Sequence, residues 1–155
     1  MKEIKLSQGQ IAQVDDEDYE FLNQWGWHAF HDGRNSYARR VNNIKHVTYR
    51  YFMHRVLLSP PNNLQIDHID HNGLNNQKYN LRFCTYAQNG MNKRCSGKSG
   101  YLGVFISSGY ITSAIKVNGK QIYLGSYKTI EDAALAYNKA ASKFHGEYAN
   151  LNIIK

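Results

Sequence analysis

A short polar stretch near the middle of the chain carries the residue types that phosphodiester hydrolysis needs. Asp67-His68 sets a carboxylate beside an imidazole, Asn80-Leu81-Arg82 follows, and Asn89 comes in a third segment. Carboxylate and amide oxygens are hard ligands that suit Mg²⁺ or Mn²⁺. An imidazole titrates near neutrality and can remove a proton from water. These residue types could therefore assemble a hydrolytic site around one divalent cation.

The elements around the first pair must bring its two side chains to one place. Gln65-Ile66-Asp67 reads as the end of an apolar strand, and residues 70–73 (Asp-His-Asn-Gly) are turn formers. Successive strand residues point to opposite faces, so His68 can join Asp67 only if the strand ends or kinks there. The turn-rich sequence favours such an end.

The third segment is expected to be a short helix. Thr85 and Gln88 have the spacing of a capping box, which places Asn89 in about the first turn. The N-terminus of a helix adds partial positive charge near a phosphate. Strand, loop, strand and helix together predict a ββα unit around one ion.

The ordered set Asp67-His68, Asn80-Leu81-Arg82 and Gln88-Asn89 resembles the HNH endonuclease family, in the H-N-N variant of phage intron-encoded homing endonucleases. The resemblance covers residues 50 to 93. It implies that His68 is the general base, that Asp67 and Asn89 hold one Mg²⁺ or Mn²⁺ ion, and that Asn80 bridges the loop structurally. It also implies cleavage of double-stranded DNA to 5′-phosphate and 3′-hydroxyl ends.

One residue departs from the family pattern. The family loop often reads Asp-His-Ile-Asp-Gly-Asn, whereas His71 stands at the glycine position here. This creates a second pair, Asp70-His71, as an alternative ligand or base. We favour the first pair because Asp67 ends the apolar strand and Asp70 falls in the turn.

The last third of the chain predicts a three-stranded antiparallel sheet packed on one helix. The β-rich runs are Leu102–Ile106, Tyr110–Val117 and Gln121–Tyr127, and Asn118-Gly119 is a strong hairpin signal between the last two. Thr129 begins a capping box, and Gly146 can end the helix. One helical face carries the apolar residues Ala133, Ala134, Tyr137, Ala140, Ala141 and Phe144.

Residues 97–152 resemble the Apetala-two or ethylene-response-factor DNA-binding domain, through motifs such as Tyr123-Leu124-Gly125-Ser126-Tyr127 and the ending 144–152. The resemblance implies that the sheet enters the major groove. The Arg and Trp positions that contact DNA in that family are Phe105, Ile111 and Gln121 here. The remaining candidate contacts are Lys116, Lys120, Gln121 and Tyr123.

The whole chain is predicted to be an α+β protein with four parts. These are a β-rich segment (1–50), the nuclease core (51–93), a basic linker (94–100) and the Apetala-like domain (101–155). A net charge of +7 with a pI near 9.4 favours a polyanionic partner. Trp25 and Trp27 are expected in a core. Further candidate DNA contacts are Arg39, Arg40, Arg55, Arg82, Lys93, Arg94 and Lys98.

The cysteines and the N-terminal sequence indicate the cellular location to expect. Cys84 and Cys95 are expected to be reduced thiols, and the N-terminus has no apolar signal segment. We expect a cytoplasmic, DNA-associated monomer or weak dimer with no membrane segment and no obligate protein partner. The alternatives are a non-catalytic DNA-binding regulator with a degenerate nuclease fold and an RNA-binding or RNA-processing protein.

Overall fold

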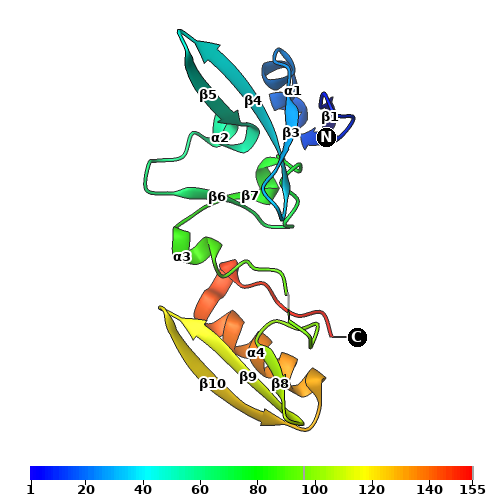
Figure 1. Cartoon of the computed structure of the whole chain (residues 1–155), viewed down its shortest axis with the longest axis vertical. Helices are drawn as coiled ribbons and strands as arrows, with labels where there is room; N and C mark the ends of the chain where they lie inside the picture. Colours follow the sequence, from blue (N-terminus) through cyan, green and yellow to red (C-terminus); the bar gives the residue numbers. More distant parts are fainter. Residues whose placement is uncertain (96, 155) are drawn as a thin grey trace. The chain divides into compact units, whose positions relative to one another are not determined.

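The computed structural model describes residues 1–95 and 97–154 and divides the chain into two compact units, Met1–Thr85 and Tyr86–Lys155 (Figure 1). Both units combine small antiparallel sheets with few helices, so the predicted α+β class is confirmed. Ser96 of the predicted linker lies outside the described residues. The described parts of the chain contain no helix long and apolar enough to cross a membrane. The predicted boundaries at residues 50, 93 and 100 stay predictions.

The first unit begins with a hairpin and a helix that share one core. The hairpin joins β1 (Lys2–Lys5) to β2 (Ile11–Val14), and α1 (Asp16–Asn23) follows. The Trp27 indole N–H donates to the Leu22 carbonyl at 2.8 Å, which satisfies its one polar atom inside this core. Trp25 packs against the same cluster, so the predicted core role of both tryptophans is confirmed. The buried members are Ile4, Leu6, Ala12, Val14, Leu22, Trp27, Ala38 and Met53.

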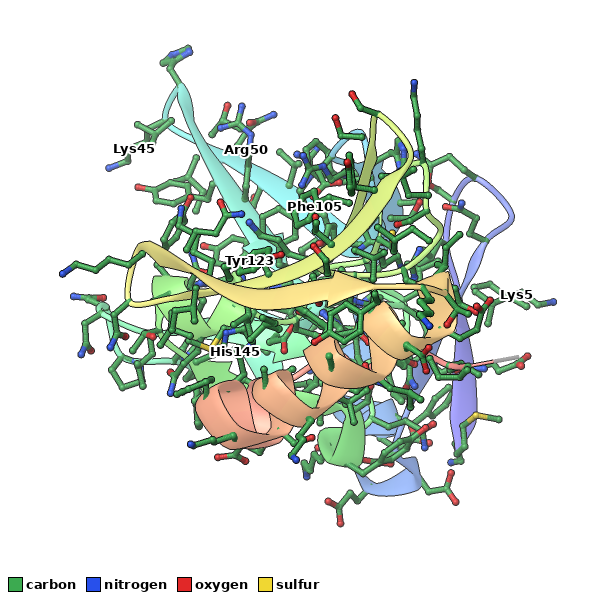
Figure 2. The ribbon with its side chains drawn as sticks, turned by 90° about the horizontal axis from the view of Figure 1, so that it is seen from below. Lys5, Lys45, Arg50, Phe105, Tyr123 and His145 are labelled. Carbon is green, nitrogen blue, oxygen red and sulfur yellow. The ribbon has the colours of Figure 1, made fainter. Side chains whose placement is uncertain are left out.

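A three-stranded antiparallel sheet follows, with the order β3-β4-β5. Its strands are His28–His31 (β3), Ser36–Ile44 (β4) and Val47–Phe52 (β5). The β4–β5 hairpin reverses at Lys45 and His46, whose φ angles of 47° and 66° are both positive. Residues 41–50 are all exposed; Lys45 lies at the turn, and Arg50 lies farther along β5, where it pairs with Val41 (Figure 2).

Apolar residues at helical spacing predict a helix from Tyr51 to Leu58, but the helix starts two residues later, as α2 (Met53–Leu58). Tyr51 and Phe52 continue β5 instead, where they pair with Arg40 and Arg39 of β4. The strand ladder satisfies their backbone groups, so the helix begins only where the pairing ends.

The last sheet of the first unit has two strands, β6 (Gln65–His68) and β7 (Leu81–Cys84). They pair antiparallel, with Asp67 opposite Arg82 and His68 opposite Leu81. Between them run an irregular loop and a short 3₁₀ helix, η1 (Lys78–Asn80). The β6–β7 pair and this loop carry most of the predicted site.

In the second unit a long helix covers one face of a three-stranded sheet (Figure 1). The turn predicted at Asn118-Gly119 is confirmed, with positive φ angles of 49° and 81°. The first strand begins at Val104 rather than Leu102, because Gly103 turns the chain with a φ of 68°. The elements are α3 (Tyr86–Asn89), β8 (Val104–Ser107), β9 (Tyr110–Val117), β10 (Lys120–Tyr127), α4 (Ile130–His145) and η2 (Gly146–Tyr148).

Helix α4 begins and ends as the sequence predicts. The Asp132 N–H donates to the Thr129 side chain at 3.1 Å, and Gly146 follows the last turn with a φ of 56°. The predicted buried face is right except at its end, because Phe144 is 41% exposed and His145 is buried. His145 lies four residues after Ala141 and thus on the same helical face, where its Nε2 is 3.0 Å from the Lys116 carbonyl oxygen.

Candidate active site

The loop between β6 and β7 is fixed by asparagine and aspartate side chains. Asn80 is 1% exposed and lies at its centre. Its side-chain oxygen accepts from the Asp70 N–H at 2.9 Å, and its amide group donates to Asp70 Oδ1 and to the Asn75 carbonyl, both at 2.9 Å. One buried amide therefore provides hydrogen-bond partners for three polar groups of the loop, which would otherwise need water as a partner.

Asp70 serves the same loop. Its Oδ1 accepts from the Asn72 N–H at 2.7 Å, and its Oδ2 accepts from the Asn75 amide at 2.8 Å. Burial raises the pKa of Asp70, but the hydrogen bonds from Asn72, Asn75 and Asn80 lower it more, and the net pKa lies below the usual value. Asp70 is thus an ionised acceptor whose two oxygens already bind loop donors.

His71 occupies a backbone conformation that favours glycine. Its φ is 63°, in the left-handed region that costs an ordinary residue about 1–2 kcal/mol. This is the position at which the loop pattern that the sequence resembles often carries glycine. The turn would therefore accommodate glycine at position 71 more easily than the histidine that stands there.

His68 lies among aromatic rings. Its ring centroid is 5.0 Å from that of His54, with the planes at 87°, and 5.8 Å from that of Tyr37. Burial lowers the pKa of His68, although a hydrogen bond with Asn76 and two nearby carboxylates act in the opposite direction. The imidazole is therefore neutral near pH 7, the form that can accept a proton.

His54 forms the other side of this ring cluster. It stacks on Phe52, with centroids 5.6 Å apart and planes at 26°, and meets the edge of Tyr37 at 5.8 Å. Burial lowers the pKa of His54 to about 3, and the charges of His68 and Arg55 add to the effect. Sequence reasoning missed Tyr37, because neither spacing nor motif relates it to the site.

Asp67 faces a guanidinium. Arg82 directs two N–H groups at the same carboxylate oxygen, Oδ2, with Nε at 2.9 Å and Nη2 at 2.6 Å. The Asp67 side chain is 7% exposed and the Arg82 side chain is 14% exposed. Arg82 is one of the candidate DNA contacts named from the sequence, and that role stays a prediction. Here it lies on the same face of the strand pair as Asp67, because the two residues are direct partners in the register.

The donor chemistry near Asp67 fits a hard divalent cation. Carboxylate oxygens are hard ligands and the Asp67 carboxylate is buried, although in this structure the Arg82 guanidinium already contacts its Oδ2. No three His, Cys, Asp or Glu side chains converge anywhere in the described ranges. Asn89 is the last residue of α3 in the second unit, and its part in such a site stays a prediction.

The side chains of two predicted DNA contacts, Arg39 and Arg40, pack against aromatic rings. The Arg39 guanidinium lies 4.0 Å from the Phe30 centroid, and its Nε is 3.2 Å from His28 Nε2. Arg40 lies 4.3 Å from the centroid of Trp25 and 4.5 Å from that of Tyr51. Both arginines therefore pack at the base of the β4–β5 hairpin instead of extending into solvent.

The other predicted contacts are exposed. Arg55 lies on the outer side of α2. The residues of the second unit are Lys93, Arg94 and Lys98 before the sheet and Lys116, Lys120, Gln121 and Tyr123 on it. Tyr123 and Phe105 lie on the face of the sheet that points away from α4 (Figure 2). Their DNA-binding roles stay predictions.

The segment that carries this site is similar to a known protein family. Residues 59–91, which span β6, its loop, β7 and α3, match the model of the HNH endonuclease family. The chain is 30% identical to an uncharacterized HNH endonuclease of Acanthamoeba polyphaga mimivirus, over 147 residues that cover 94% of this chain and 76% of the relative. No solved structure matches. The predicted HNH-type enzyme is confirmed: the chain belongs to the HNH endonuclease family.

Proposed function

We propose that the protein hydrolyses phosphodiester bonds in double-stranded DNA as a homing-type endonuclease that nicks as a monomer and uses Mg²⁺ or Mn²⁺. One observation carries the proposal. Asp67 and His68 are adjacent at the end of β6, one a buried carboxylate and the other a buried imidazole with a lowered pKa. The loop that follows them is held by Asn80.

Each residue has a separate task in this proposal. Asp67 and Asn89 would hold the cation, which when bound polarises the phosphate and stabilises the leaving 3′-oxygen. His68 accepts the proton of the attacking water, because its imidazole is neutral near pH 7. Asn80 and Asp70 maintain the turn that ends the strand at His68.

The alternative pair, Asp70-His71, has less support as ligand and base. Both oxygens of Asp70 accept hydrogen bonds from the loop. His71 is only part buried and lies in a strained turn. His68 combines burial with a lowered pKa, as a residue in a water-poor catalytic site does.

We further propose that the second unit binds DNA through the exposed face of its sheet, as its resemblance to the Apetala-two domain implies. Phe105, Tyr110 and Tyr123 are exposed large aromatic residues at 51%, 71% and 64%. Lys116 and Gln121 are direct partners in the β9–β10 register and are also exposed. Exposed cations beside flat rings suit a phosphate backbone and its bases.

A plasmid-nicking assay tests the catalytic proposal. Wild type with Mg²⁺ should convert supercoiled plasmid to the open circle, and His68→Ala should lower the rate by about 10²–10⁴-fold, the usual contribution of a general base. His71→Gly is the matched control and should stay near the wild-type rate. A wild type that shifts DNA in gels without nicking it would instead support a non-catalytic regulator.

A further inference from the structure

The Asp67–Arg82 ion pair lies where the proposed cation would bind. Two guanidinium N–H groups meet one carboxylate oxygen at 2.9 Å and 2.6 Å. We propose that Arg82 is a positioning residue that holds the Asp67 carboxylate against premature cation binding, so that the metal binds tightly only when a DNA phosphate is present. This inference rests on the proposed role of Asp67 as a metal ligand.

The first step is electrostatic. A divalent cation bound to Asp67 would come close to the guanidinium on the same carboxylate, and like charges repel strongly where water is scarce. Both side chains are largely buried, so solvent screens little of this repulsion. In the absence of DNA, Arg82 therefore weakens cation binding at Asp67.

The second step concerns what remains when the guanidinium is removed. The position of Asp67 is set by the β6–β7 ladder, in which its neighbours Ile66 and His68 are also buried. The backbone register thus keeps residue 67 in place on its strand without Arg82. Loss of the charge should outweigh loss of the two hydrogen bonds, and cation binding should become tighter.

The third step links the cation to the substrate. A phosphodiester offers the guanidinium a second anionic partner of matching geometry, and Arg forms paired hydrogen bonds to phosphate as readily as to carboxylate. When Arg82 turns toward a phosphate, the Asp67 oxygen is released to the cation. DNA and metal then increase each other's affinity, because such a coupling is reciprocal.

Mn²⁺ binding measured by titration calorimetry tests the first part on the full chain without DNA. Arg82→Gln should bind Mn²⁺ at least about 10-fold more tightly than wild type, within the usual range of coupling between sites. Arg34→Gln removes the same charge from an exposed turn and should change the affinity little. Asp67→Asn combined with Arg82→Gln should abolish the gain. An affinity of Arg82→Gln equal to or below wild type would overturn the proposal.

A second measurement needs no Arg82 variant to fold. In the His68→Ala background, in which cleavage should be about 10²–10⁴-fold slower, a random-sequence duplex of about 30 base pairs should tighten Mn²⁺ binding by about 10-fold or more. Equal Mn²⁺ affinity with and without the duplex would also overturn the proposal. Wild-type plasmid nicking reports separately on the proposed function. If wild type nicks plasmid but neither Arg82→Gln nor the duplex changes the Mn²⁺ affinity, the proposed role of Arg82 is wrong and the proposed function still stands.

Discussion

The two units carry charge in opposite ways. Met1–Thr85 contains ten Lys and Arg against nine Asp and Glu, whereas Tyr86–Lys155 contains nine against three. In the first unit several charges are paired or stacked, as at Arg82, Arg40 and Lys78. In the second unit the lysines of the sheet are exposed. Paired charges build a defined site, and unpaired exposed cations supply long-range attraction to a polyanion.

The cysteines give the largest expected difference between the units. Burial raises the pKa of Cys84 to about 11, so at pH 8 only about one molecule in a thousand carries the reactive thiolate there. Cys95 of the second unit is part exposed. Iodoacetamide followed by mass spectrometry should label Cys95 at least about 100-fold faster. The Cys84 rate should rise about tenfold with each pH unit and level off as the pH passes about 11. Equal rates at pH 8 would show that the first unit opens readily.

An asparagine clamp in each unit provides the next comparison. Asn80→Ala removes three hydrogen bonds from a fully buried position and leaves loop groups without partners, so unfolding free energy should fall by about 3–5 kcal/mol.

The matched change is Asn152→Ala. That side chain makes two hydrogen bonds to the Leu102 backbone from a part-exposed position, and the loss should be about 2 kcal/mol. Urea unfolding measures both. A smaller effect at Asn80 than at Asn152 would contradict the central place of Asn80 in the loop.

The charge difference predicts where DNA affinity resides. Replacing both Lys116 and Lys120 by Gln should weaken binding to a short duplex by about 10-fold and reduce the slope of log affinity against log salt by about 2. Replacing Lys2 and Lys5 in the first unit is the matched control and should change neither quantity. Fluorescence anisotropy at several salt concentrations measures both. If replacing Lys2 and Lys5 weakens DNA binding as much, the assignment of DNA affinity to the second unit is wrong.

The smallest effect concerns one turn of the first unit. His71→Gly should raise the unfolding free energy by about 0.5–1 kcal/mol, because relief of the left-handed strain exceeds the added freedom of the unfolded chain. Thermal melting measures the change. Loss of stability would mean that the His71 side chain makes contacts worth more than its backbone strain.

Much of the second unit could be predicted because its signals are local. A capping threonine, an alanine-rich face and an Asn-Gly turn each act within a few residues. Helix α1 was missed for the opposite reason. Half of its residues are acidic, and Leu22 is its only buried residue, so no apolar period marks it.

The site was predictable in its residue types but not in its pairings. The order of Asp67, His68 and Asn80 is visible in the sequence, and so is the turn-rich loop. Which side chain faces Asp67 depends on the register of β7, which the twelve residues between the strands set through their folded shape. The stacking of Arg40 on Trp25 joins residues from different elements in the same way.

The β4–β5 hairpin has a consequence for how the first unit opens. The ten residues around its tip, 41–50, form a two-stranded ribbon in which every residue is exposed, and isolated ribbons of this kind are barely stable in water. Its amide hydrogens should therefore exchange with deuterium through local fraying that begins at Lys45 and His46. Protection should rise toward Ala38, where the ribbon meets the core. The same molecule thus contains a gradient from a frayed tip to a rigid base along a single pair of strands.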